Sequence, residues 1–152
     1  MRRYNNNYRR YRAPRARRPT DRVIRAASTL VSGSTTTTGY VWTCEQPCTI
    51  TNFKLDTGSD TGSLAIAYAW VYVPEGYNAN AITYPSLASD MYNPTKNVII
   101  SGVLNGTSTE DHKSSRYSRK CVAGDRLALL FYDSSPSGTS TVSFELSFTV
   151  VA

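Results

Sequence analysis

The sequence predicts an all-β protein, an eight-stranded antiparallel jelly-roll sandwich with a disordered basic arm at its N-terminus. Three observations support this prediction. The composition favours strands, because 11 of the 152 residues are tyrosine and Thr, Ser, Val and Ala fill much of the rest, whereas Glu, Lys and Gln are sparse. Short β-branched and aromatic runs alternate with turns rich in Gly, Pro and Ser. The positive charge is concentrated at one end of the chain.

Residues 1–25, MRRYNNNYRRYRAPRARRPTDRVIR, form the predicted arm. They hold ten arginines and one acidic residue, so the arm carries a net charge of about +9. Residues 26–152, by contrast, hold seven basic and ten acidic side chains. The arm is expected to be disordered, because it has almost no aliphatic side chains, its charges repel one another, and Pro14 and Pro19 interrupt any helix.

The arginines and tyrosines of the arm predict binding to single-stranded nucleic acid without sequence preference. Guanidinium groups fork onto phosphate oxygens and release counterions, and tyrosine rings stack on unpaired bases, for roughly 1–3 kcal/mol per base. A nuclear-import signal and a solubilising tail are the alternative interpretations. The residues expected to bind nucleic acid are Arg2, Arg3, Arg9, Arg10, Arg12, Arg15, Arg17, Arg18, Arg22, Arg25, Tyr4, Tyr8 and Tyr11.

The predicted shell domain, residues 26–152, is expected to carry eight strands, the first of which begins within the end of the arm. In segment 48–56, the apolar side chains step by three from Ile50 to Phe53, which predicts a β-bulge at Thr51 and Asn52. The expected strands are 23–32, 40–44, 48–56, 63–73, 97–104, 117–122, 126–133 and 141–152.

Two of these strands have informative patterns. Segment 63–73 is apolar on both faces, which predicts a central strand whose second face is covered by its own chain or by a neighbouring one. Segment 141–152 alternates strictly, which predicts a strand with one buried face. The side chains expected to turn inward there are Val142, Phe144, Leu146, Phe148 and Val150.

Two segments between the strands are expected to be loops. Residues 77–97 contain Pro85 and Pro94 and show no period of 2 or 3.6, and residues 107–115 are polar. Loops at the ends of a sandwich can make the contacts that close a symmetric assembly. Both segments are therefore candidates for contacts between subunits.

The sequence contains no motif that predicts catalysis or a cofactor. There is no HExxH, Walker or GxGxxG motif, and the only histidine, His112, lies in a polar segment. The chain is therefore not expected to be an enzyme, and no metal site is predicted. Glu110, Asp111 and His112 would suit a hard cation between subunits, although a solvated loop is the favoured interpretation.

Three cysteines, Cys44, Cys48 and Cys121, are an odd number and do not predict a disulfide framework. Cys44 and Cys48 flank a short turn and would face each other across a hairpin, which leaves open whether they form a disulfide. A zinc site would lack a fourth ligand, so semi-buried thiols are the favoured interpretation. No run of 18 apolar residues predicts a membrane span, and no signal peptide is expected.

An arginine-rich arm joined to a small sandwich resembles the capsid proteins of very small icosahedral viruses. The start, MRRYNNNYRRYRAPRARRP, resembles the arms of capsid proteins from circular single-stranded DNA viruses, the circovirus-like group. The segments CTITNFKLD, AYAWVYVPEG and VAGDRLALLF are similar to the satellite tobacco necrosis virus type of coat protein. The resemblance implies a T=1 shell of sixty identical subunits, arms inward, around single-stranded nucleic acid, with DNA favoured over RNA. It also implies location in the virion, assembly in the host nucleus, and a host receptor that the sequence does not identify.

Two other functions are compatible with the same sequence. One is a monomeric β-sandwich module with a basic tail that binds carbohydrate or nucleic acid, in which Tyr40, Trp42 and Trp70 would form a stacking platform. The other is a nucleic-acid chaperone or chromatin-type protein. Particle formation separates the capsid interpretation from both.

Overall fold

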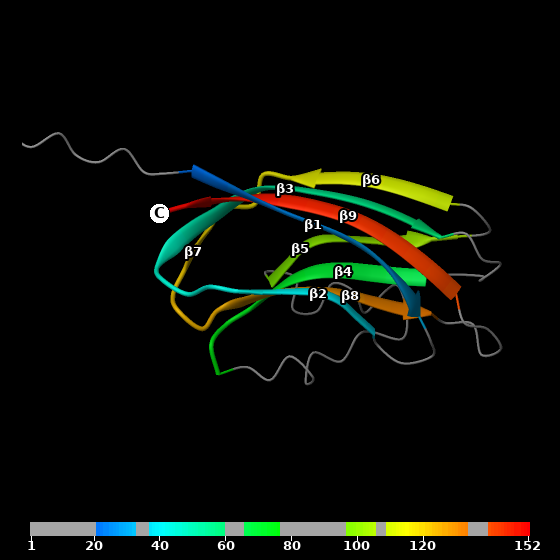
Figure 1. The fold of residues 1–152 in the computed structure, drawn as a ribbon, viewed down its shortest axis with the longest axis horizontal. Helices are drawn as coiled ribbons and strands as arrows, with labels where there is room; N and C mark the ends of the chain where they lie inside the picture. The colour runs from blue at the N-terminus through cyan, green and yellow to red at the C-terminus, as the bar shows by residue number, and fades with distance from the viewer. Residues whose placement is uncertain (1–20, 33–36, 60–65, 77–96, 106–108, 134–139) are drawn as a thin grey trace, which may run out of the picture.

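Nine β-strands build two facing sheets in the residues that the computed structural model describes, which are 21–32, 37–59, 66–76, 97–105, 109–133 and 140–152. Figure 1 shows the two layers, with β1, β3, β6 and β9 in one and β2, β4, β5 and β8 in the other. The strands are β1 (Asp21–Ser32), β2 (Thr37–Thr43), β3 (Cys48–Ser59), β4 (Ile66–Val73), β5 (Val98–Leu104), β6 (Thr109–Ser115), β7 (Arg119–Cys121), β8 (Arg126–Asp133) and β9 (Ser140–Val151).

No helix within the described ranges is both long and apolar enough to cross a membrane. The predicted contact segment 77–97 lies outside the described residues except for its last residue.

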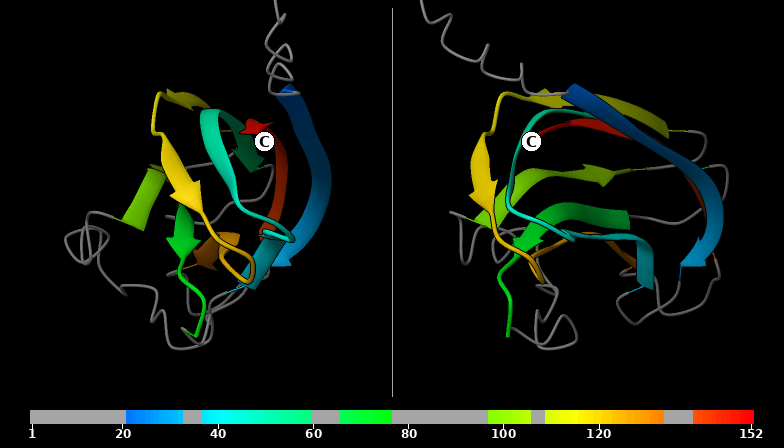
Figure 2. Two further views of the ribbon diagram at one scale, coloured as in Figure 1. Left: turned by 90° about the vertical axis from the view of Figure 1, so that its left-hand side faces the viewer. Right: turned by 60° about the vertical axis from the view of Figure 1, so that its left-hand side comes forward.

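The predicted jelly-roll fold is confirmed, and the structure adds the strand order. All pairs are antiparallel, in the orders β1-β9-β3-β6 and β2-β8-β4-β5, with the short β7 added beside β3. Apart from β7, the first strand pairs with the last, β2 with β8, β3 with β6, and β4 with β5. A single long antiparallel hairpin gives this order when it is rolled up into two sheets. Figure 2 shows the roll from two further sides, with β1 curving along its edge toward β2.

The first strand begins earlier than predicted. β1 starts at Asp21 and pairs with β9 along its whole length. Arg22 and Arg25, which the prediction placed in the arm, are therefore part of the sheet. The sheet therefore includes residues 21–25 of the predicted arm.

A ninth strand, β6, runs through residues that were predicted to be a polar loop. It pairs with β3 at the edge of its sheet. Two of its inward side chains, Asp111 and Lys113, join it to the opposite sheet. The Tyr68 hydroxyl of β4 donates a hydrogen bond to Asp111, and Lys113 Nζ donates to the Ser101 carbonyl of β5 over 2.7 Å. These two contacts, here called the polar clamp, attach β6 to the opposite sheet in place of hydrophobic packing. The strand therefore lacks the alternation of apolar and polar residues by which a strand is predicted from sequence.

The other eight strands match the predicted segments, with ends that differ by up to three residues. The predicted bulge in β3 is confirmed, because the pairing of β3 with β9 shifts register between Thr51 and Lys54. Asn52 adopts a φ of 55°, in the left-handed region that few residues enter. The extra residue allows both Ile50 and Phe53 to face the core, where both are fully buried.

Aromatic rings that meet around Phe148 of β9 dominate the core between the sheets. Phe53 of the same sheet stacks on Phe148 with ring centroids 5.6 Å apart. Trp42 and Trp70, from β2 and β4 of the other sheet, meet Phe148 edge-on at 5.3 Å and 5.8 Å. Such pairs contribute about 0.5–1.5 kcal/mol each beyond burial, so this cluster joins the two sheets. The inward face of β9 is as predicted, with Val142, Phe144, Leu146 and Phe148 buried and Val150 packed against the core.

Both faces of β4 are covered, as predicted. One face contributes Ile66, Tyr68, Trp70 and Tyr72 to the core between the sheets. The other face joins a second buried cluster, made of Ala69, Val71, Val73, Ala128 and Leu130. This second cluster is buried within a single chain, so a neighbouring chain is not needed to cover it.

Asp125 joins the turn between β7 and β8 to the end of β4, at one end of the sandwich. Its Oδ2 accepts hydrogen bonds from the Tyr72 hydroxyl at 2.5 Å and the Val122 N–H at 2.8 Å, and its Oδ1 accepts one from the Glu75 N–H at 2.9 Å. Burial by itself would raise the pKa of Asp125, but these hydrogen bonds and the charge of Arg119 outweigh it and lower the pKa. Burial and the neighbouring carboxylate raise the pKa of the Tyr72 hydroxyl.

Candidate nucleic-acid interface

Of the thirteen residues predicted to bind nucleic acid, two lie on β1 and the others lie outside the described residues. Arg22 and Arg25 are three residues apart on a strand, so their side chains point to opposite faces of the sheet. Arg25 faces the outer surface, and Arg22 faces the opening between the two sheets. The residues outside the described part are Arg2, Arg3, Arg9, Arg10, Arg12, Arg15, Arg17, Arg18, Tyr4, Tyr8 and Tyr11.

Arg25 borders a groove of about 480 Å³ on the outer face of the β1-β9-β3-β6 sheet, here called the basic groove. Three cations, Arg25, Lys54 and Arg116, line it, and none of the described residues that line it is acidic. Its other polar side chains are hydroxyls and one amide, from Ser114, Ser115, Ser147, Thr149 and Asn52. The groove therefore offers hydrogen-bond donors and positive charge without a built-in counter-charge.

The strand register sets the spacing of these cations. Arg25 of β1 and Lys54 of β3 both lie opposite Ser147 of the intervening β9, and Lys54 also lies opposite Ser114 of β6. The Cα atoms of Arg25 and Lys54 are thus two strand spacings, about 10 Å, apart. Arg25, Lys54 and Arg116 are exposed, and among the described residues no carboxylate forms an ion pair with any of them.

An acidic patch, made of Asp56, Glu110 and Glu145 around His112, adjoins the basic groove on the same sheet face. In the row after Lys54, Asp56 lies opposite both Glu145 and His112. His112 Nδ1 is 2.8 Å from Asp56 Oδ1, and its Nε2 is 3.9 Å from Glu110 Oε2. Asp56, through its hydrogen bond and charge, raises the pKa of His112, and Glu110 adds to the effect. The outer face is therefore divided into a cationic and an anionic half.

β6 separates the three residues that were considered for a cation site. Glu110 and His112 lie on the outer face, whereas Asp111 lies between the sheets with Tyr68 and Lys113. In the part of the chain that the structure describes, no group of three or more His, Cys, Asp or Glu side chains is placed to hold a metal ion. The set is thus not brought together within one chain, and the solvated loop that was favoured there is a strand.

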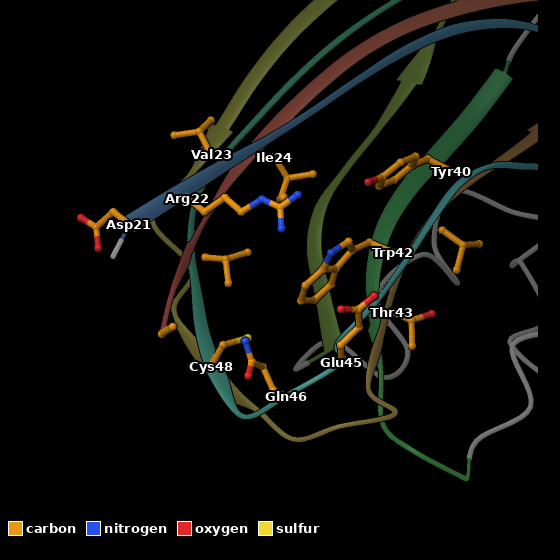
Figure 3. Close-up of a pocket in the computed structure, with 13 residues that line it drawn as sticks. Asp21, Arg22, Val23, Ile24, Tyr40, Trp42, Thr43, Glu45, Gln46 and Cys48 are labelled. Atoms are coloured by element: carbon orange, nitrogen blue, oxygen red, sulfur yellow. The ribbon is translucent and has the colours of Figure 1, made fainter. Parts of the chain in front are cut away.

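A second hollow, of about 1000 Å³, opens between β1 and β2 at the edge of the sandwich (Figure 3). Arg22 extends from β1 toward Trp42, with Tyr40 on the same strand as Trp42 and Glu45 in the following turn. Trp70, the third member of the predicted stacking platform, is fully buried and packs against aromatic side chains of the core. The platform as predicted is therefore wrong, although Tyr40 and Trp42 do line one hollow.

The three thiols gather where β2 turns into β3. The Sγ atoms of Cys44 and Cys48 are 3.5 Å apart across the turn, as predicted, and Cys48 lies opposite Cys121 of β7. All three cysteines are free. Burial raises the pKa of Cys44 to about 11 and that of Cys121 to about 12, so both thiols stay protonated at neutral pH. The half-buried Cys48 is the most accessible of the three.

No family model matches the chain, and no curated protein matches it either. Among solved structures, the chain is similar to a subunit of Bacillus endospore appendages, described as disulfide-linked pili, with a TM-score of 0.52 and 11% identity over 88% of this chain and 89% of that chain. A chain of infectious bursal disease virus, Gx strain, aligns with a TM-score of 0.45 and 13% identity over 87% of this chain and 32% of that chain. The first of these likenesses shows a shared β-sandwich fold and nothing more.

Proposed function

We propose that the chain is a capsid subunit that assembles into a small icosahedral shell and packages single-stranded nucleic acid. The observation that carries the proposal is that a cationic segment, residues 1–20, is joined directly to a jelly roll. This segment holds eight arginines and no acidic residue, and β1 follows it at once. Jelly rolls occur as the wall domains of virus particles. Arginines at this density neutralise phosphates and release counterions. One part of the chain therefore suits a wall, and the other suits its cargo.

The charge of the cationic segment fits a small genome. In a T=1 shell, sixty copies of eight arginines would bring roughly 480 positive charges, enough to neutralise a comparable number of phosphates. Arginine suits the purpose because its planar fork binds phosphate through two hydrogen bonds. The virion is then the location of the protein. Assembly in the host nucleus and a preference for DNA over RNA are part of the same proposal.

A monomeric carbohydrate-binding module is the second candidate, and the hollow between β1 and β2 favours it. Tyr40 and Trp42 line that hollow beside the polar side chains of Arg22 and Glu45. Sugar rings stack on such aromatic faces. The candidate is weaker than the first because Trp42 packs against Phe148 of the core and because this module would leave the cationic segment without a role.

Electron microscopy and size-exclusion chromatography of the purified chain test the capsid proposal. We expect closed particles with an ultraviolet absorbance that shows bound nucleic acid. Solitary 16.8-kDa molecules without nucleic acid under all salt and pH conditions would contradict it. Two variants test the packaging role of the eight arginines before β1. Replacing all of them by Gln should abolish retention of nucleic acid, whereas the matched replacement by Lys should preserve most of it, because the charge remains.

A further inference from the structure

We infer that the basic groove is a second binding site for the phosphate backbone of single-stranded nucleic acid, built into the folded wall. The inference rests on the proposed packaging function and adds Lys54 and Arg116 to the residues that would contact the cargo. It also states which end of the sheet faces the cargo.

The cations of the groove have no counter-charge beside them. Arg25 and Lys54 are held about 10 Å apart by the strand register, with only Ser147 between them. Arg116 is a third exposed cation on the same lining, and no described carboxylate pairs with any of the three. Like charges gathered in this way repel one another. A polyanion that spans the groove removes the repulsion at several points at once.

The hydrogen-bond donors around the cations are of the kind that binds phosphate. Hydroxyl groups of Ser114, Ser147 and Thr149 line the groove together with the cations. Serine and threonine hydroxyls commonly donate hydrogen bonds to phosphate oxygens, and such bonds position a nucleic acid without reading its sequence. No aromatic side chain on the outer face is needed for such binding. The groove thus suits the backbone of a nucleic acid and not its bases.

The groove lies close to the point where the arginine-rich residues before β1 join the sheet. β1 begins at Asp21, and Arg25 lies four residues further along the same extended strand, about 13 Å away. Arg25 is also the last arginine of the N-terminal series. A nucleic acid held by the arginines before β1 would therefore reach the groove across one short stretch of β1, past the single carboxylate of Asp21.

The acidic patch limits the path. Asp56 and Glu145 occupy the next row of the same face and would repel phosphates. The backbone must therefore cross the strands, from β1 over β9 to β3, near the end where β1 begins. This end of the sheet would face the cargo, and the acidic end would point away from it.

Salt-dependent binding of a fluorescent oligodeoxythymidine to the full chain tests the inference. The variant Lys54→Ser should weaken binding about two- to fivefold at 0.1 M salt, as loss of one exposed ion pair would. It should also make the plot of log affinity against log salt shallower by about 0.7, and Lys54→Ser with Arg116→Ser by about 1.4. An oligouridine of the same length should show equal losses, because phosphate is the group recognised.

Lys120→Ser is the matched control. Lys120 is an exposed lysine on β7, the short strand that also pairs with β3, and it does not line the groove. Its replacement should leave both the affinity and the slope unchanged. Groove variants that bind like the unaltered chain, or a Lys120→Ser loss equal to that of Lys54→Ser, would overturn the inference while leaving the packaging function intact. Failure of the unaltered chain to bind the oligonucleotide at low salt would overturn both.

Discussion

Asp125 shows how much one buried carboxylate contributes when both of its oxygens have partners. Its side chain is 3% exposed and accepts hydrogen bonds from Tyr72, Val122 and Glu75. Asp125→Asn places an amide N–H against these donors, so we expect the free energy of unfolding to fall by about 2–4 kcal/mol. Urea unfolding of the disassembled subunit measures it. Tyr72→Phe, which removes one donor, should cost about 1 kcal/mol, and Asp56→Asn on the exposed face should cost little.

The free energy of unfolding at acidic pH tests the same role of Asp125. Because the folded-state pKa of Asp125 lies below its ordinary value of 3.8, the charged carboxylate stabilises the fold at all pH values above that. Its contribution is lost as the pH falls below 3.8 toward the folded-state pKa. The difference in stability between the natural chain and Asp125→Asn should therefore shrink in that window. A difference that is constant from pH 7 to pH 2 would show that the charge of Asp125 does not matter.

At the scale of single residues, the sequence predicts which apolar side chains are buried, but not which polar side chains are hydrogen-bonded to one another. Apolar and polar residues alternate along β9, and this alternation predicts that its apolar side chains, Phe144, Leu146 and Phe148, are the buried ones. The role of Asp125 is not readable, because its partners at Tyr72 and Glu75 are some 50 residues away along the chain and meet it only in the folded sandwich.

At the scale of one element, the bulge of β3 depends on a single backbone conformation. Asn52 has a φ of 55°, which Gly adopts freely and a β-branched residue adopts only with strain. Asn52→Gly should leave the free energy of unfolding nearly unchanged, whereas Asn52→Val should lower it by about 1–3 kcal/mol. Thr43→Val, at an exposed extended position of β2, is the control and should be neutral. Equal stabilities of the two Asn52 variants would contradict the role given to the backbone.

The elements were predicted where their inward residues are apolar and missed where they are not. The bulge was visible because Ile50 and Phe53 are both apolar and three apart. β6 was missed because its inward residues Asp111 and Lys113 form the polar clamp with Tyr68 and Ser101. A polar strand at a sheet edge resembles a loop in sequence, and only its partners reveal it.

At the scale of the whole molecule, we expect the pairing of β1 with β9 to set where the folded domain begins. Deleting residues 1–20 leaves β1 complete, so we expect the thermal unfolding midpoint of the subunit to stay unchanged. Deleting residues 1–25 also removes Ile24, which packs against the core, and should lower the midpoint. Deleting residues 1–32 exposes the edge of β9 and should give insoluble protein. Equal midpoints for the first two deletions would place the domain boundary at residue 26, as first predicted.

The basic groove could not be predicted from the sequence, because its formation depends on the strand order of the fold. Arg25, Lys54 and Arg116 are far apart in the chain, and each alone is an ordinary surface cation. They meet because the jelly roll brings β1, β9, β3 and β6 side by side in that order. Fold class and strand faces follow from local patterns, whereas this grouping needs the strand order, which no local pattern contains.

The pairing of the first described strand with the last also places the start of β1 beside the C-terminus. Asp21 lies opposite Val151, and Figure 1 shows the C-terminus beside the start of β1. A peptide fused after Ala152 would thus emerge on the side from which the arginine-rich segment departs. If subunits close around a genome, such a fusion would be carried into the lumen, which makes the C-terminus a natural attachment point for guest molecules in an engineered cage.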